Sequence, residues 1–124
     1  MTTKREVCEG LGESDWTALE KYGKNTYRVV YRTGWAIRLH HTNVFYVSNR
    51  KIWLDSGDWR SLTTKGRIND GFAYLNMSIG VWAKKGVWYV HGLKNFSKPV
   101  KFYDGMCIDL QGNLLNENIL REAS

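Results

Sequence analysis

The sequence predicts an α+β protein built mostly from antiparallel strands, arranged as a twisted meander or partly open barrel with short helices. Apolar and polar residues alternate in several runs between residues 26 and 110, as is typical of half-buried strands. Turn-forming pairs such as Lys85-Gly86 and Asp104-Gly105 separate these runs and favour hairpins. At 124 residues, the chain has the length of a single domain.

Two short helices are expected among the strands. The first covers about residues 14–22, because Ser14 is a suitable N-cap and the apolar residues Trp16, Leu19 and Tyr22 recur at helical spacing. The second covers residues 63–70. Thr63 or Thr64 is expected to cap it, and Asp70-Gly71 is expected to end it.

The strands are expected within residues 26–54 and 78–110. The first block gives two hairpins, and the second gives one hairpin around Lys85-Gly86 and another around Asp104-Gly105. Residues 116–122 are expected to form a last helical turn.

Two registers are possible for the hairpin over residues 26–39. A two-residue loop at Thr33-Gly34 would divide the apolar side chains between the two faces. A three-residue loop, with Gly34 left-handed, pairs Tyr31 with Trp35 and collects the apolar side chains on one face, so we favour it. This register places Arg28 directly opposite Arg38. The expected core then comprises Tyr27, Val29, Tyr31, Ile37, Leu39, Phe45, Val47, Ile52 and Leu54.

The net charge of +6 is unevenly distributed along the chain. Residues 26–101 carry 13 Lys and Arg against three Asp and Glu, a net +10, whereas residues 1–25 carry −1 and residues 102–124 carry −3. A concentrated positive charge favours an anionic partner through long-range attraction and counterion release. The alternative is that the lysines only keep a small domain soluble.

The first candidate site is basic. Arg28, Arg38 and His40 share the solvent-facing side of the favoured hairpin, and Lys65 and Arg67 follow the N-terminus of the second predicted helix. Arginine pairs bidentately with phosphate and a helix N-terminus attracts anions, so these residues are expected to form a phosphate cradle. The alternative is a solvated strand face whose arginines pair with Asp55, Asp58 or Asp70.

The second candidate site is aromatic. Trp82 and Trp88 lie in one predicted hairpin beside Lys84 and Lys85, and Tyr46 and Trp53 share one face of another. Aromatic rings beside cations are typical of proteins that hold single-stranded nucleic acid. Tryptophan and tyrosine are also common core residues, so each ring has a structural alternative.

The sequence gives little support for catalysis or a cofactor. His40 and His41 are adjacent, so on a strand they point to opposite faces and do not share a metal. A metal-dependent nuclease centre built from Asp55, Asp58, His40 and Lys65 is disfavoured, because acids are sparse in this region. We therefore expect a protein that is not an enzyme and has no cofactor and no metal.

A cytoplasmic protein without a membrane segment is expected. No run approaches the about 18 apolar residues that a spanning helix needs. Residues 1–12 are charged and lack the apolar stretch of a secretory signal. Cys8 and Cys107 lie far apart, outside any zinc-binding spacing, and are expected to be reduced.

The segments AIRLHHTNV, IWLDSGDWRSLTTKGRIN and KKGVWYV, in this order, resemble a group of small uncharacterised bacteriophage proteins. Those proteins carry an RLHxT strand, an LxSGxWxTxTTKxRIN segment and a GVWYV strand; here Ser61 replaces one threonine. The resemblance covers about residues 26–90 and implies a phage protein acting in a bacterial cytoplasm. Together with the basic, aromatic strands it favours a nucleic-acid-binding accessory protein. The alternative is an inhibitor that binds a host protein, such as a defence complex or a polymerase.

Overall fold

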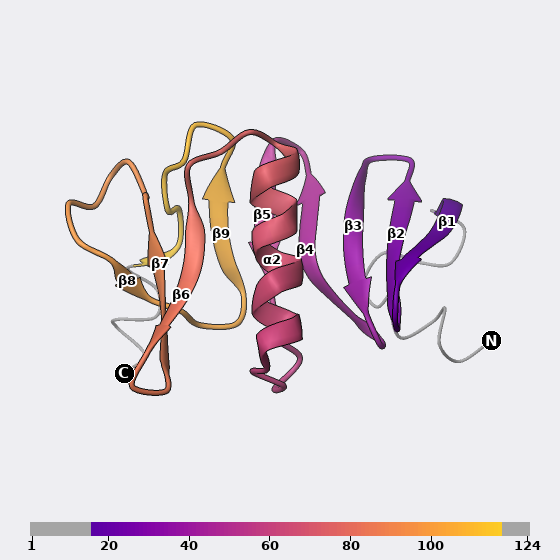
Figure 1. Ribbon diagram of the computed structural model, residues 1–124. Coiled ribbons are helices and arrows are strands. Elements are labelled where there is room, and N and C mark those ends of the chain that lie inside the picture. Colours follow the sequence, from indigo (N-terminus) through magenta and orange to yellow (C-terminus); the bar gives the residue numbers. More distant parts are fainter. Residues whose placement is uncertain (1–15, 118–124) are drawn as a thin grey trace.

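The computed structural model describes residues 16–117, and their side chains from residue 18 onward. It contains two open antiparallel sheets and one helix, which confirms the α+β class (Figure 1). The large sheet consists, in spatial order, of β1 (Trp16–Gly23), β2 (Thr26–Tyr31), β3 (Gly34–Leu39), β4 (Thr42–Ser48), β5 (Lys51–Leu54) and β9 (Met106–Asp109). The small sheet consists of β6 (Gly80–Lys84), β7 (Val87–His91) and β8 (Val100–Lys101), and the helix is α2 (Leu62–Tyr74). Within the described residues, neither sheet closes into a barrel.

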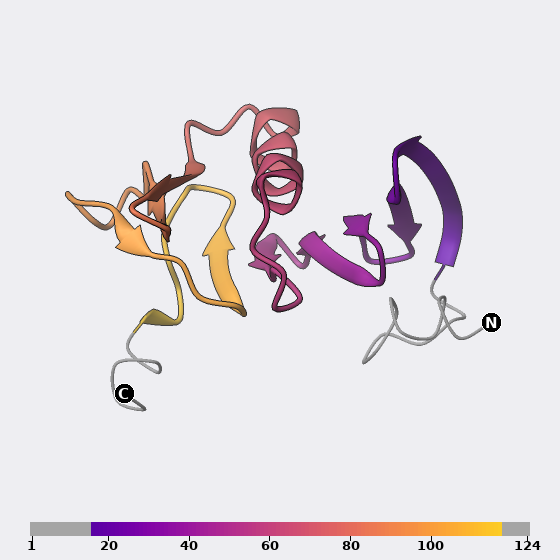
Figure 2. The same ribbon diagram turned by 60° about the horizontal axis from the view of Figure 1, so that its bottom comes forward.

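The main core lies between the large sheet, α2 and the small sheet. The helix covers one face of the large sheet, and the small sheet stands beside it (Figures 1 and 2). Ile52 of β5, Phe72 of α2 and Val90 of β7 are fully buried in one continuous apolar cluster. Both sheets therefore share one core.

Helix α2 begins earlier and ends later than expected. Ser61, not Thr63 or Thr64, is the N-cap, and its hydroxyl accepts a hydrogen bond of 3.1 Å from the backbone nitrogen of Thr64. Asp70-Gly71 does not end the helix, because Gly71 is buried against the sheet: a Cβ there would lie 2.3 Å from Cγ of Phe45. The glycine allows close contact between helix and sheet and does not act as a stop signal.

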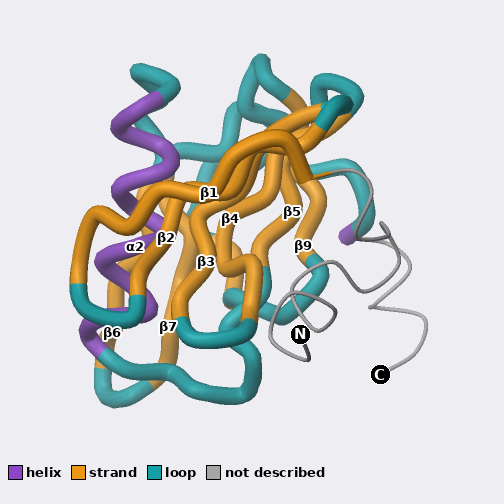
Figure 3. The backbone as a smooth tube through the Cα atoms, turned by 90° about the vertical axis from the view of Figure 1, so that its right-hand side faces the viewer, coloured by secondary structure: helices purple, strands orange, loops and turns teal. Residues whose placement is uncertain are grey.

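The helix predicted near residues 14–22 is wrong. Residues 16–23 form β1, which pairs antiparallel with β2 at the edge of the large sheet; Figure 3 shows the strands of this sheet side by side. Three apolar residues at helical spacing are a weak signal, and here the backbone pairing with β2 decides the structure.

The favoured register of the β2–β3 hairpin is also wrong. The last pair between the two strands is Val30 with Trp35, so four residues separate the paired positions instead of three. Arg28 pairs with Ile37, and Arg38 pairs with Tyr27. The two arginines therefore lie on opposite faces of the sheet. The prediction assumed a single buried face, but this part of the sheet is buried on both. Ile37 and Leu39 enter the main core, whereas the opposite face holds a second cluster formed by Val29, Tyr31 and Ala36.

Arg38 is the clearest consequence of this register. It was expected to be exposed, yet the residue is only 5% exposed and its Cζ lies 4.2 Å from the ring centroid of Tyr27. A guanidinium stacks well on an aromatic face, and this contact helps to bury the charged side chain. Most of the predicted core is confirmed; Tyr27 and Val47 are half-buried rather than buried.

The hairpin predicted around Asp104-Gly105 does not form. A tight turn is present, with Gly105 at φ +90° and the Met106 nitrogen 3.3 Å from the Tyr103 oxygen. The flanking strands, however, belong to different sheets: β8 pairs with β7, and β9 pairs with β5. The hairpins over residues 42–54 and 80–91 are confirmed.

Three further expectations concern the C-terminal helical turn, the cysteines and a membrane segment. The helical turn predicted at residues 116–122 falls mostly on residues 118–124, outside the described residues. Cys107 is a buried free thiol, and Cys8 also lies outside the described part. Between residues 16 and 117, no helix is long and apolar enough to cross a membrane.

Candidate nucleic-acid interface

The three strands of the small sheet present two different faces. Val81, Trp88 and Val90 point into the main core. Because side chains alternate along a strand, their neighbours point outward. These neighbours, Gly80, Trp82, Lys84, Val87, Tyr89, His91 and Lys101, form what we call the outer face of the small sheet.

A row of three side chains crosses this outer face. Trp82 of β6 pairs with Tyr89 of β7, and Tyr89 pairs with Lys101 of β8. Directly paired residues of antiparallel strands have Cβ atoms about 5 Å apart, so the three side chains are immediate neighbours. Trp82 is 60% exposed, Tyr89 is half-buried and Lys101 is exposed. The outer face therefore offers two aromatic rings and a cation in one line.

The Trp82 indole lies back over Gly80. A Cβ on Gly80 would lie 3.2 Å from the indole nitrogen of Trp82, so the absence of a side chain makes room for the ring. The His91 ring stands edge-on to the indole, with 6.4 Å between centroids and 88° between planes. Local packing thus positions an exposed tryptophan.

All Asp, Glu, Lys and Arg residues in the segment that contains the small sheet are lysines. From residue 71 to residue 103 the chain carries five lysines and no Asp or Glu. Lys84 lies on the outer face, two residues from Trp82, and Lys85 is exposed in the adjoining turn. This acid-free stretch is a sequence signal that could have drawn attention to the small sheet.

Two features define the conformation of the β6–β7 hairpin. Its turn residues Lys85 and Gly86 both have positive φ, 52° and 78°, the conformation that suits a two-residue hairpin turn. On the other side, the Asn69 side chain of α2 binds the free edge of β6. Its amide donates to the Val81 oxygen at 3.0 Å, and its oxygen accepts from the Val81 nitrogen at 2.7 Å.

Trp88 does not belong to this interface. It is 5% exposed on the inner face and packs edge-on against Phe102 at 5.3 Å. Arg60, which the sequence did not single out, lies over the Phe102 ring at 4.9 Å. Of the residues predicted in this hairpin, Trp82, Lys84 and Lys85 come together, and Trp88 is a core residue.

The predicted phosphate cradle does not assemble. Arg28 and Arg38 lie on opposite faces of the large sheet. Lys65 and Arg67 are two residues apart on a helix, about 200° around its axis, and so point to different sides. His40 lies in the turn between β3 and β4, where it lines a cavity together with His41.

Two arginines near β1 contact carboxylates; Asp70 is one of the partners that the alternative interpretation named, and Glu20 is not. Arg67 contacts Asp70 at 3.3 Å and donates to Thr26 Oγ1 at 3.0 Å. Arg28 lies 3.6 Å from Glu20. Burial, together with the nearby Asp70 carboxylate, raises the pKa of Tyr22 to about 12. In this cluster, the positive charges of Arg28 and Arg67 are thus offset by the carboxylates of Glu20 and Asp70.

Tyr46 and Trp53 share the outer face of the large sheet, as expected, and pair directly across β4 and β5. The Tyr46 ring packs edge-on against Tyr31 at 5.6 Å, which ties it to the second apolar cluster. Trp53 is 39% exposed. Lys51, the nearest cation along β5, pairs with Asp109 of β9, so this face is less positive than the small sheet. Among residues 16–117, no group of three or more His, Cys, Asp or Glu is placed to hold a metal.

The fold and the outer face of the small sheet describe an α+β protein with an exposed aromatic and basic β surface. The chain belongs to the Kyanoviridae Gp96 protein family, which matches residues 5–109, and is thus a bacteriophage protein. This confirms the resemblance to phage proteins noted from the sequence. No curated protein and no solved structure matches the chain.

Proposed function

We propose that this phage protein binds single-stranded nucleic acid on the outer face of the small sheet. The observation that carries the proposal is the row formed by Trp82, Tyr89 and Lys101. Exposed rings on a sheet stack against unpaired bases, and each stacked base contributes about 1–3 kcal/mol. The lysine at the end of the row is suited to a backbone phosphate.

The shape of the surface favours a single strand over a duplex. A duplex keeps its bases stacked, so proteins that read it insert a helix or ribbon into a groove or follow its phosphates. The outer face instead presents ring surfaces on a sheet, with Lys84 and Lys101 beside them. This arrangement suits bases that are already unstacked.

The binding test uses fluorescence anisotropy with short labelled DNA and RNA strands, at several salt concentrations. Trp82→Ala removes the exposed ring and is expected to weaken binding about 5- to 150-fold, the equivalent of one stacked base. Lys84→Ala and Lys101→Ala are each expected to lower the slope of log affinity against log salt by about 0.7, the value for one phosphate contact on a single strand.

Trp53→Ala is the matched control, because Trp53 is an exposed strand tryptophan on the other sheet. Its affinity and salt slope are expected to stay at the wild-type values. Absence of binding at low salt, or equal losses in Trp82→Ala and Trp53→Ala, would refute the proposal. Either result would favour a host protein as the partner.

A further inference from the structure

A second surface feature is a cavity of about 400 Å³ on the other sheet. Three segments meet there: the turn between β3 and β4 with His40 and His41, the loop after β5 with Ser56 and Trp59, and the first turn of α2 with Thr64. Its volume is within the range of about 300–1,000 Å³ that is typical of small-molecule sites.

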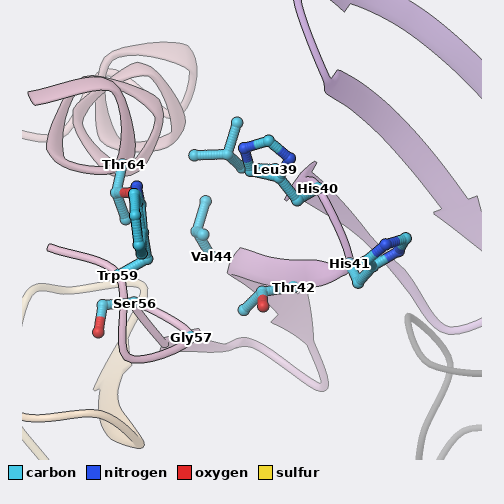
Figure 4. Close-up of a pocket in the computed structure, with 9 residues that line it drawn as sticks. All are labelled: Leu39, His40, His41, Thr42, Val44, Ser56, Gly57, Trp59 and Thr64. Atoms are coloured by element: carbon cyan, nitrogen blue, oxygen red, sulfur yellow. The ribbon is translucent and has the colours of Figure 1, made fainter. Parts of the chain in front are cut away.

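The cavity has the form of a slot. Figure 4 shows the Trp59 indole on one side, Leu39 and His40 on the other, and Val44 between them. Trp59 is 67% exposed, and none of the ring contacts within the described residues involves it. An exposed indole that faces apolar and imidazole groups across a gap is suited to cover one face of a flat ring.

The loop that carries Trp59 is held in place by its own hydrogen bonds. The Gly57 nitrogen donates to Asp55 Oδ1 at 2.7 Å, and the Trp59 nitrogen donates to the Ser56 oxygen at 3.0 Å. Gly57 has φ +63°, and a Cβ there would lie 2.4 Å from Thr42 Oγ1, so the loop sits directly on the start of β4. A preformed slot loses less entropy when it binds a ligand.

The polar groups of the cavity suit a neutral heteroaromatic ring better than an anion. Its lining includes the His40 imidazole and the hydroxyls of Thr42 and Thr64, which donate and accept hydrogen bonds, but no Lys or Arg. The His41 ring and the Ser56 hydroxyl point away from the gap (Figure 4). Neither Asp55 nor Asp58 lines the cavity, but both lie in the loop that carries Trp59, and the Asp55 carboxylate accepts a hydrogen bond from the lining residue Gly57, so the charge of this loop is not suited to a phosphate.

We infer that this slot binds a single nucleobase, stacked on Trp59. The base can be that of a free nucleoside or one splayed from a strand, since both present the same ring. The inference goes beyond strand binding at the small sheet, because no residue is shared between the slot and the outer face.

The test is isothermal titration of the full chain with adenosine, guanosine, cytidine and uridine, and with ribose 5-phosphate and inorganic phosphate as base-free probes. At least one nucleoside is expected to bind, and neither base-free probe is. Trp59→Ala is expected to weaken the nucleoside about 5- to 150-fold, while Trp59→Phe, which keeps a ring, retains most of the affinity. Trp82→Ala is expected to leave it unchanged.

The same variants separate the two sources of the base. If the slot takes a base from a strand, Trp59→Ala also weakens oligonucleotide binding; if it takes only a free nucleoside, strand affinity is unaffected. Trp82→Ala is expected to lose strand binding and to keep nucleoside binding. This result would show that the slot and the small-sheet surface are separate sites. The inference is overturned if no nucleoside binds, if Trp59→Ala binds as the wild type does, or if inorganic phosphate binds equally well.

Discussion

Two glycines of α2 show how much a single position depends on its surroundings. Gly71 is buried, and a Cβ there would lie 2.3 to 2.5 Å from three atoms of the Phe45 ring. Gly66, five residues earlier in the same helix, has nothing within 4 Å of its added Cβ. The two sites have the same backbone conformation and differ in what a methyl group would meet.

Opposite effects on stability are therefore expected from the same substitution. Gly71→Ala forces α2 away from β4 and is expected to lower the free energy of unfolding by about 1–3 kcal/mol. Gly66→Ala reduces the entropy of the unfolded chain and is expected to raise it by about 0.5–1 kcal/mol. Urea unfolding followed by circular dichroism measures both. Equal effects at the two positions would contradict the close contact between Gly71 and Phe45.

Single residues of the candidate interface were only partly predictable. Strand alternation, applied to β6 and β7, would have placed Trp82 with Lys84 on one face and Trp88 with Val90 on the other. Which face is buried depends on where the large sheet and α2 lie, and no local pattern contains that information. Arg38 illustrates the same limit, because its burial requires a second covered face of the sheet.

At the scale of elements, local turn chemistry was a good guide. The pairs Asn49-Arg50 and Lys85-Gly86 adopt left-handed conformations between paired strands, and both hairpins were predicted. Pairing between distant segments was not accessible in the same way. Strand β9 joins β5 about 50 residues earlier in the chain, and only the assembled core selects that partner.

Asn69 links two elements that are not neighbours in the sequence. Its side-chain amide replaces a neighbouring strand for Val81, satisfying both backbone groups of that residue. Asn69→Ala leaves this N–H and C=O unpaired at a partly buried position and is expected to cost about 2 kcal/mol of stability. Thr63→Ala, at an exposed position of the same helix, is the control and is expected to change stability by less than about 0.5 kcal/mol. Thermal unfolding compares the two variants; similar midpoints would contradict the proposed role of Asn69.

At the scale of the whole molecule, the shared core joins the two sheets. Ile52 of the large sheet and Val90 of the small sheet lie in the same apolar cluster, together with Ile68 of α2. Unfolding of either sheet would therefore expose the core side chains of the other. The single domain expected from the sequence length stays a prediction, which unfolding experiments can test.

A single cooperative unfolding transition follows from the shared core. Ile52→Ala and Val90→Ala each create a cavity and are expected to lower the free energy of unfolding by about 2–4 kcal/mol. Both variants should shift the loss of amide protection in both sheets, measured by hydrogen exchange in increasing urea. If Val90→Ala unfolds the small sheet and leaves the large sheet protected, the two sheets are separate units.

The hydrogen bonds from Asn69 to Val81 also affect how molecules meet one another. An edge strand with free N–H and C=O groups is a template on which a strand of a second molecule can add, and sheets grow into aggregates in this way. At Val81, the second residue of β6, those groups are already used by the helix side chain. Sideways growth of the small sheet is blocked at that point, so its aromatic outer face can stay open to solvent at high protein concentration without recruiting neighbouring chains along this edge.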